Sequence, residues 1–200
     1  LPIKQFKKIN GRIFEKHVTL KKKKVNFIYK KAKKREINKL KNFKLLKDNG
    51  FIEYPEYGFK ELNTVCNKIK ALNGGALFID YGYNNQMDVN SLQSVMKHKF
   101  NDINKNIGKA DITSLVNFSL YEKYFNFKGL DVEKIITQSN FLQKMGIIER
   151  FEIASNKLSD QEKSNLYLRL KRLIHPKMMG ESFKVIFAKN NKCNFSLAFR

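Results

Sequence analysis

The chain has 200 residues, of which 42% are hydrophobic, and a formal net charge of +22. This length and apolar content suffice for one packed domain. No apolar run approaches the roughly 20 residues that span a bilayer, and the two cysteines, Cys66 and Cys193, stand far apart with no zinc-ligand spacing around them. We therefore expect a soluble protein of a reducing compartment, without a transmembrane helix, a disulfide framework or a metal site.

The positive charge is concentrated at the start of the chain. Residues 1–50 hold 16 Lys and 2 Arg against three acidic residues, Glu15, Glu36 and Asp48. Such an excess indicates a polyanionic partner, such as RNA, DNA or an anionic membrane surface. The cations are mostly lysine, however, and Asn and Ile are also abundant, as an AT-rich genome produces without selection for binding. A solvated lysine surface is the simpler interpretation, and both remain open.

The N-terminal segment predicts a small β-meander followed by a helix. Asn10-Gly11 is the favoured dipeptide for a type I′ hairpin turn, and the apolar residues after it alternate as in a strand. A third short strand is expected over residues 25–29. Residues 31–46 have helical spacing and end at Asp48-Asn49-Gly50, which is a stop signal.

The next segment predicts a helix that leads into a strand. Apolar residues recur at helical spacing over residues 59–72, and Gly74-Gly75 would cap the helix. The apolar run Gly75–Asp80 then has the pattern of a buried parallel strand. Because chemistry collects at the carboxyl ends of such strands, Asp80 is the first candidate for a functional carboxylate. The alternative is that Asp80 caps a turn in which Gly82 supplies a positive φ.

The remaining elements are shorter. A helical turn is expected after Ser91, a loop over residues 101–108, a helix capped by Asn117, a strand-like run over residues 130–138, and a short helix after it. Ser159, with Glu162 three residues later, predicts a capping box that starts a longer helix. Residues 183–199 read as a terminal β-hairpin.

Motifs that identify a reaction by themselves are absent. The sequence has no G-x-G-x-x-G, G-x-x-x-x-G-K-[ST], G-x-S-x-G or H-E-x-x-H. Of the three histidines, only His98 follows the candidate strand closely enough to be considered for a site. Asp111 and Thr113 have the same two interpretations as Asp80. They are candidates for a functional site, but Asp and Thr two residues apart are also ordinary turn formers.

Five strings occur together and in order along the chain: "LPIKQF" at Leu1–Phe6, "GGALFIDYGY" at Gly74–Tyr83, "GKADITSLVNF" at Gly108–Phe118, "TQSNFLQKMGI" at Thr137–Ile147 and "HPKMMGESFKVI" at His175–Ile186. The set resembles the MidA-type S-adenosylmethionine-dependent methyltransferases, a family that includes the mitochondrial complex I assembly-factor arginine methyltransferase. Two positions depart from the family pattern: Ser139 stands where Gly is usual, and Asn117 where Asp is usual.

The resemblance implies an α/β fold. It would be the C-terminal portion of a class I, Rossmann-like methyltransferase, with parallel strands and a terminal antiparallel hairpin. Residues 1–50 would then be a basic hairpin-and-helix insertion, and residues 51–200 the C-terminal half of the methyltransferase domain. In the family, the glycine-rich loop that holds S-adenosylmethionine precedes the "LP" string, so we expect the cofactor-binding residues to lie upstream of residue 1 and these 200 residues alone to be inactive.

The resemblance also implies a substrate and its site. We expect methylation of an arginine in a protein substrate, which in mitochondrial members would be a respiratory complex I subunit, with the protein in the bacterial cytoplasm or the mitochondrial matrix. Asp80 and Asp111 are the candidates for orienting the guanidinium. Five residues are expected at the substrate rim: Tyr81, Gly82, His98, Thr113 and Gln138. The alternative function is a basic RNA- or protein-binding module without catalysis.

Overall fold

The computed structural model describes residues 2–22, 24–46, 50–85, 88 and 90–199. Its contacts divide the mixed α/β chain into two compact units, which are described separately. Unit 1 consists of Leu1–Thr64 with Met87–Leu115, and unit 2 of Val65–Gln86 with Val116–Arg200. This division differs from the expected boundary at residue 50.

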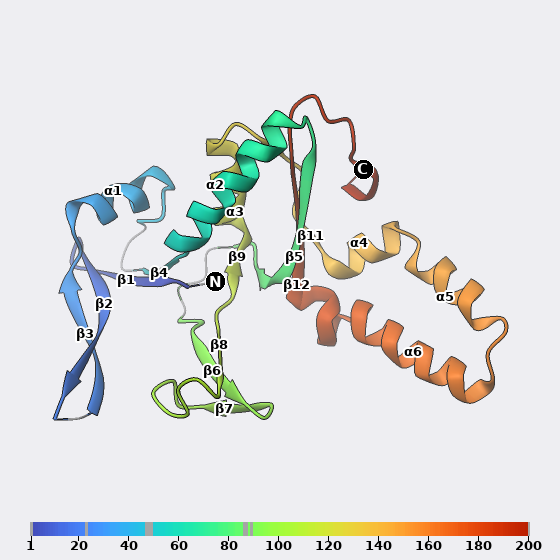
Figure 1. Ribbon diagram of the computed structural model, residues 1–200, viewed down its shortest axis with the longest axis horizontal. Coiled ribbons are helices and arrows are strands. Elements are labelled where there is room, and N and C mark those ends of the chain that lie inside the picture. Colours follow the sequence, from blue (N-terminus) through green and yellow to red (C-terminus); the bar gives the residue numbers. More distant parts are fainter. Residues whose placement is uncertain (1, 23, 47–49, 86–87, 89, 200) are drawn as a thin grey trace. The chain divides into compact units, whose positions relative to one another are not determined.

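Unit 1 contains a four-stranded antiparallel sheet in the order β3-β2-β1-β4 (Figure 1). Its strands are β1 (Lys4–Ile9), β2 (Arg12–Lys21), β3 (Lys24–Lys31) and β4 (Phe51–Tyr54). Asn10 and Gly11 both have positive φ, 46° and 74°, which confirms the predicted type I′ turn. Because β4 pairs with β1, the chain returns to the N-terminal sheet just after residue 50.

Two helices pack with this sheet. The helices are α1 (Lys34–Asn42) and α2 (Glu56–Ala71). Helix α1 is shorter than expected at both ends, because β3 continues to Lys31 and because Lys44, with φ of 53°, does not continue the helix beyond Asn42. Leu40 of α1 and Phe6 of β1 are fully buried. The buried rings of Phe43, Tyr54 and Phe59 form a cluster with centroids 5.4–6.3 Å apart.

A second, three-stranded sheet in unit 1 has the order β7-β6-β8. Its strands are β6 (Gln93–Met96), β7 (Lys99–Asn101) and β8 (Asp111–Thr113). The helical turn expected after Ser91 is therefore wrong. Lys97 and His98 have φ values of 49° and 62°, so they form a tight turn that pairs β6 with β7 instead of continuing a helix.

The central feature of unit 2 is the antiparallel pairing of β5 (Gly75–Tyr83) with β12 (Phe183–Lys189) over seven aligned residue pairs (Figure 1). The predicted parallel strand is only partly confirmed. Strand β9 (Val116–Asn117) pairs parallel with the last two residues of β5, Gly82 and Tyr83. Strand β5 thus begins within an antiparallel ladder and ends in a parallel one.

The predicted terminal hairpin is wrong. After β12, residues 190–196 contain no helix or strand, and Leu197–Phe199 form a short 3-10 helix. The edge of β12 that a last strand would need is occupied by β10 (Asp131–Val132) and β11 (Ile136–Thr137). The rings of Phe195 and Phe199 instead pack on Phe187, with centroids 5.6 and 5.8 Å away.

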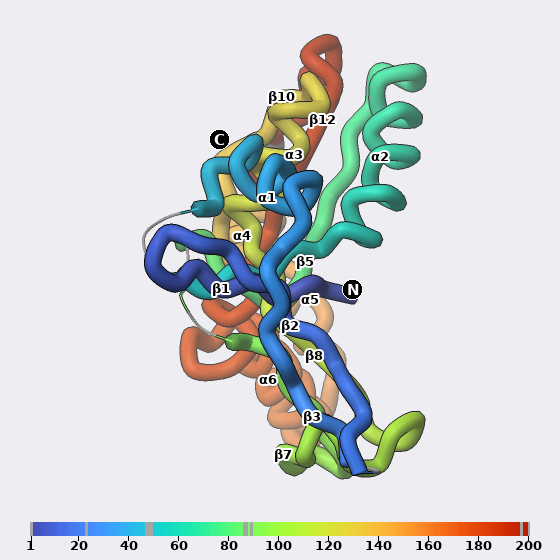
Figure 2. The backbone as a smooth tube through the Cα atoms, turned by 90° about the vertical axis from the view of Figure 1, so that its left-hand side faces the viewer, coloured from blue at the N-terminus to red at the C-terminus, as the bar shows by residue number. Residues whose placement is uncertain are grey.

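Strand β5 is covered on one face only. Phe78 stacks on Phe125 of α3 (Phe118–Phe127), and Figure 2 shows α3 running along β12. On the opposite face the side chains of Leu77, Ile79 and Tyr81 remain 42–44% exposed. The expectation that this strand is buried is therefore wrong for that face.

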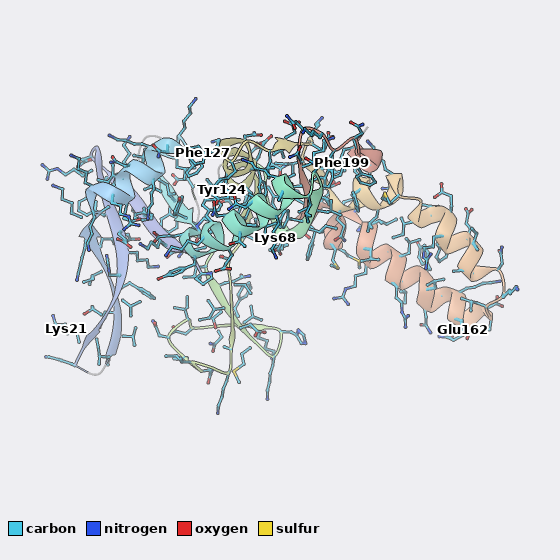
Figure 3. The ribbon with its side chains drawn as sticks, turned by 45° about the horizontal axis from the view of Figure 1, so that its top comes forward. Lys21, Lys68, Tyr124, Phe127, Glu162 and Phe199 are labelled. Atoms are coloured by element: carbon cyan, nitrogen blue, oxygen red, sulfur yellow. The ribbon has the colours of Figure 1, made fainter. Side chains whose placement is uncertain are left out.

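The predicted helices of unit 2 are confirmed. They are α3, α4 (Gln138–Lys144) and α6 (Asp160–Ile174). Helix α5 (Ile147–Ser155), which the sequence analysis did not predict, lies between α4 and α6 in the sequence, and the turn η1 (Pro176–Gly180) follows α6. Asn117 caps α3 by accepting a hydrogen bond from the backbone N–H of Leu120. Ser159 and Glu162 form the predicted capping box at the start of α6, where Figure 3 labels Glu162.

The glycines around β5 have roles that differ from those expected. Helix α2 is terminated by Asn73, with φ of 49°, rather than by Gly74 or Gly75. Gly82 does not have a positive φ, so the alternative in which Asp80 caps a turn at Gly82 is wrong. A Cβ atom on Gly82 would lie 2.1 Å from the carbonyl oxygen of Val116, so glycine is required because β9 approaches β5 closely.

We therefore expect Gly82→Ala to lower the free energy of unfolding by about 1–3 kcal/mol, because the backbone of β9 must move to admit the methyl group. Gly74→Ala is the matched control, since a Cβ atom there meets nothing within 4 Å. Urea titration followed by circular dichroism measures both. Equal stability of the two variants would contradict this account of Gly82.

Glu15 and Glu36 of the basic segment join Glu56 of α2 in an ion cluster inside unit 1. Lys4 Nζ lies 2.7 Å from Glu56 Oε2, 3.5 Å from Glu36 and 3.8 Å from Glu15, and Lys39 also contacts Glu56. These five residues come from β1, β2, α1 and α2. Hydrogen bonds from Lys39 and Lys4 lower the pKa of Glu56 from 4.5 to about 2.

The depressed pKa predicts a pH-dependent stability. The stabilisation is fully present above pH 4.5, the ordinary pKa of the group, and is lost as the pH falls toward 2. At neutral pH, Glu56→Gln should lower the free energy of unfolding by about 1–3 kcal/mol, and the difference from wild type should shrink across that range. Glu61→Gln, an exposed position on the same helix, is the control. A difference that is constant from neutral pH to pH 2 would refute the assignment.

Candidate functional site

Asp80 lies near the end of β5 with its side chain exposed. One carboxylate oxygen, Oδ1, accepts a hydrogen bond of 2.7 Å from the backbone N–H of Tyr81. Lys184 is directly opposite Asp80 on β12, so a cation and an anion share this face of the sheet. The strand holds the backbone of Asp80 in place while its carboxylate remains accessible.

Tyr121 of α3 is a neighbour of Asp80 that the sequence analysis missed. Burial and the charge of Asp80 raise the pKa of the Tyr121 phenol above its usual range, so the phenol remains protonated at neutral pH. A signal was present in the sequence, because Tyr121 lies three residues after Phe118 and four before Phe125, both of which are buried. Helical spacing therefore puts Tyr121 on the face of α3 that covers β5.

Tyr81 does not share a face of the sheet with Asp80. Successive side chains of a strand point to opposite faces, and the Tyr81 ring lies 5.7 Å from the ring of Phe183 on the other face of the sheet. Gly82 is in close contact with β9, as described above. Of the three consecutive candidates, Asp80 alone therefore presents a charged group on its face.

Gln138 is 6% exposed and is the first residue of α4. Its side-chain amide donates a hydrogen bond of 2.9 Å to the carbonyl oxygen of Leu173 in α6. This bond joins the start of one helix to the end of another.

The candidates in unit 1 lie on the small sheet. Thr113 lines a cavity of about 450 Å³. Its lining residues are Pro2, Ile3, Leu92, Ile112, Thr113 and Ser114. Asp111 is exposed two residues earlier on β8, where it pairs with Val95, and His98 is exposed in the turn between β6 and β7. Asp111 and Thr113 thus share a strand that borders an apolar cavity, whereas Asp80 belongs to the other unit.

A buried polar network supports this cavity and was also missed. Glu53 is 6% exposed; it accepts hydrogen bonds from Gln5 Nε2 at 2.8 Å and from the backbone N–H of Ser91 at 3.1 Å. The Ser91 hydroxyl also contacts Glu53 and accepts a hydrogen bond of 2.9 Å from the N–H of Leu115. The network holds the residues next to Leu92 and Ser114. No local sequence signal reveals it, since its partners are 24–48 residues apart.

The described residues do not by themselves fit an S-adenosylmethionine cradle, which needs a glycine-rich loop between a strand and a helix. Among the described residues, three connections from a strand to the following helix are too short for such a loop. Pro55 is the single residue between β4 and α2, and β9 and β11 lead directly into α3 and α4. At Gly75 and Gly82, the space beside the backbone is filled by Phe187 and Val116. The described residues also contain no group of three or more metal-ligating side chains and no helix long and apolar enough to cross a membrane.

Comparison with known proteins identifies relatives. Residues 1–136 match the model of a family described as "Putative S-adenosyl-L-methionine-dependent methyltransferase". The protein named "Protein arginine methyltransferase NDUFAF7, mitochondrial" from Danio rerio is 28% identical over 129 residues, 64% of this chain and 30% of the relative. The Homo sapiens protein of the same name is 28% identical over 123 residues, 61% of this chain and 27% of the relative. The matched region is less than a third of these relatives' length.

Two solved structures from Burkholderia thailandensis share the fold. One, an uncharacterized protein, superposes with a TM-score of 0.82 at 24% identity, over 98% of this chain and 54% of its own. The other, solved bound to S-adenosyl-homocysteine, superposes with a TM-score of 0.81 at 24% identity, over 99% of this chain and 52% of its own. The family model covers more than half of the sequence, and the chain therefore belongs to this family of S-adenosyl-L-methionine-dependent methyltransferases.

Proposed function

We propose that this chain works as part of an S-adenosylmethionine-dependent methyltransferase that modifies an arginine of a protein substrate. The family match supports the reaction class, and the relatives named as protein arginine methyltransferases support the substrate class. A respiratory complex I subunit is the substrate that the family resemblance suggests for a mitochondrial member.

The observation that carries the proposal is the exposed carboxylate of Asp80, held near the end of a strand and beside the buried Tyr121. A carboxylate can accept two parallel hydrogen bonds from a guanidinium, which fixes the plane of the arginine side chain. Orientation of the reacting nitrogen is the main task of such a site.

In the other unit, Asp111 offers a second exposed carboxylate, and Thr113 borders the cavity with Pro2 and Ile3. The apolar lining suits the hydrocarbon part of a peptide rather than its charges. We assign Asp111 to guanidinium orientation as well. Tyr81, Gly82, His98, Thr113 and Gln138 remain proposed rim residues.

We further propose that the cofactor is held by polypeptide outside these 200 residues. The chain spans 54% and 52% of the two solved relatives, and its described residues provide no cradle. Isothermal titration of the 200-residue chain with S-adenosylmethionine should therefore give no measurable heat of binding. Micromolar affinity for S-adenosylmethionine would disprove this part of the proposal and would leave the assignment of arginine as the substrate unaffected.

Substitution of the two carboxylates tests the arginine assignment. In an enzyme that includes this chain and the cofactor-binding region, Asp80→Asn and Asp111→Asn should each lower kcat/KM for an arginine-containing substrate about 10- to 100-fold, because an amide cannot pair with a guanidinium as a carboxylate does. Asp131→Asn, an exposed position on β10, is the control. Methyl incorporation and circular dichroism are measured together. Wild-type turnover in both variants, with the fold intact, would eliminate the assignment.

A further inference from the structure

Strands β2 and β3 continue past β1 as a two-stranded ribbon. Strand β1 pairs with β2 only over Arg12–Glu15, whereas β2 and β3 remain paired from Phe14 and Lys31 to Lys21 and Lys24 (Figures 1 and 2). Residues 16–21 of β2 and 24–29 of β3 thus pair only with each other, and no other described strand pairs with them. At 3.4 Å per residue, this ribbon is about 20 Å long.

One face of the ribbon is apolar and unusually exposed. Directly opposite residues share a face, and the cross-strand pairs Lys16 with Tyr29, Val18 with Phe27, and Leu20 with Val25 define this apolar face. Val18 and Leu20 are 67% and 71% exposed, and Phe27 and Tyr29 are 38% and 43% exposed. These side chains therefore do not form a core, in contrast to Phe6 of β1, which is fully buried.

The same segment is strongly basic. Residues 16–35 contain nine lysines and one arginine and no acidic residue. The nearest acids in the sequence, Glu15 and Glu36, are already paired with Lys4 in the ion cluster. Lys21, Lys22 and Lys24 are exposed at the tip of the ribbon, where Figure 3 labels Lys21.

We propose that the apolar face of the ribbon docks on the surface of an anionic lipid bilayer, with the tip lysines among the lipid phosphates. An amphipathic element with a basic rim binds such a surface through buried apolar area together with attraction to anionic headgroups. This proposal concerns the ribbon alone and is independent of the proposed methyltransferase function.

The composition of the apolar face favours a lipid surface over a nucleic acid or a second copy of the chain. Val18, Leu20 and Val25 are aliphatic and offer no ring on which a nucleic-acid base could stack. Of the two rings on this face, that of Phe27 has the ammonium of Lys16 over it, 4.3 Å from the ring centroid, and the other belongs to Tyr29. A second copy of the chain would bring two segments of ten cations each together, which like-charge repulsion opposes. A hydrocarbon layer beneath anionic headgroups matches both the apolar face and the charge.

Vesicle flotation of the 200-residue chain tests the proposal. The chain should bind vesicles of phosphatidylcholine with about 30% phosphatidylglycerol, and should bind pure phosphatidylcholine at least tenfold more weakly. Val18→Ser with Leu20→Ser should weaken binding about tenfold through loss of apolar contact. Lys21→Glu, Lys22→Glu and Lys24→Glu together should weaken it about a hundredfold.

The second sheet of unit 1 and the loops that connect its strands provide matched controls. Phe100→Ser with Ile107→Ser removes two residues that are 85% and 75% exposed, and Lys97→Glu, Lys99→Glu and Lys105→Glu reverse three exposed lysines. Both controls should retain at least half of the wild-type affinity if the ribbon is the docking element. Circular dichroism of each variant establishes that it is folded.

The chain contains no tryptophan, so the fluorescence emission of a single introduced tryptophan reports the environment of the ribbon. Leu20→Trp should bind the anionic vesicles and shift its emission to the blue, whereas Phe100→Trp should not shift. The proposal is overturned if the chain does not float, if the serine pair on the ribbon has no effect, or if the Leu20→Trp emission does not move. It is also overturned if single-stranded RNA binds the ribbon more tightly than the vesicles do, or if the ribbon's apolar face joins two copies in sedimentation equilibrium.

Discussion

The antiparallel ladder between β5 and β12 is the constraint on which unit 2 depends. Val185, Ile186, Phe187 and Ala188 of β12 are buried, because α3 packs on one face of the strand and the aromatic residues of the C-terminal segment pack on the other. With β10 and β11 on its far edge, β12 has no further pairing capacity. Strand β5 therefore lies between β12 and β9, and this position fixes the backbone of Asp80 while its carboxylate remains open to a ligand.

In unit 1, the corresponding constraint is the arrangement of its few carboxylates among many lysines. A segment with so few carboxylates could spread them over its surface, but the fold gathers Glu15, Glu36 and Glu56 around Lys4 and Lys39 inside the unit. These ion pairs link the sheet to both helices. The consequence is that the remaining cations of the ribbon face solvent without acidic neighbours in the sequence, next to apolar side chains that form no core.

Local signals predicted local structure well. The Asn10-Gly11 turn, the Asn117 cap and the capping box of Ser159 and Glu162 are all present, since each depends on backbone preferences within about four residues. The errors concern pairing. The apolar run before Asp80 was expected to be buried in a parallel sheet, and residues 183–199 were expected to form a hairpin, but the partners of β5 and β12 come from distant parts of the chain. The Glu53 network was missed for the same reason, whereas Tyr121 was missed although its helical spacing from Phe118 and Phe125 was visible in the sequence.

The sequence by itself determined the family, the positions of most helices and turns, the basic character of the first 50 residues and the candidate carboxylates Asp80 and Asp111. Only the tertiary structure decided that β5 continues past Asp80 to Tyr83, that Gly82 is required by the close approach of β9 rather than by a turn, and that the apolar residues of the β2–β3 ribbon are exposed instead of forming a core. The physical reason is that turn and cap preferences act between neighbours, whereas burial and strand pairing depend on which segments fill each edge and face.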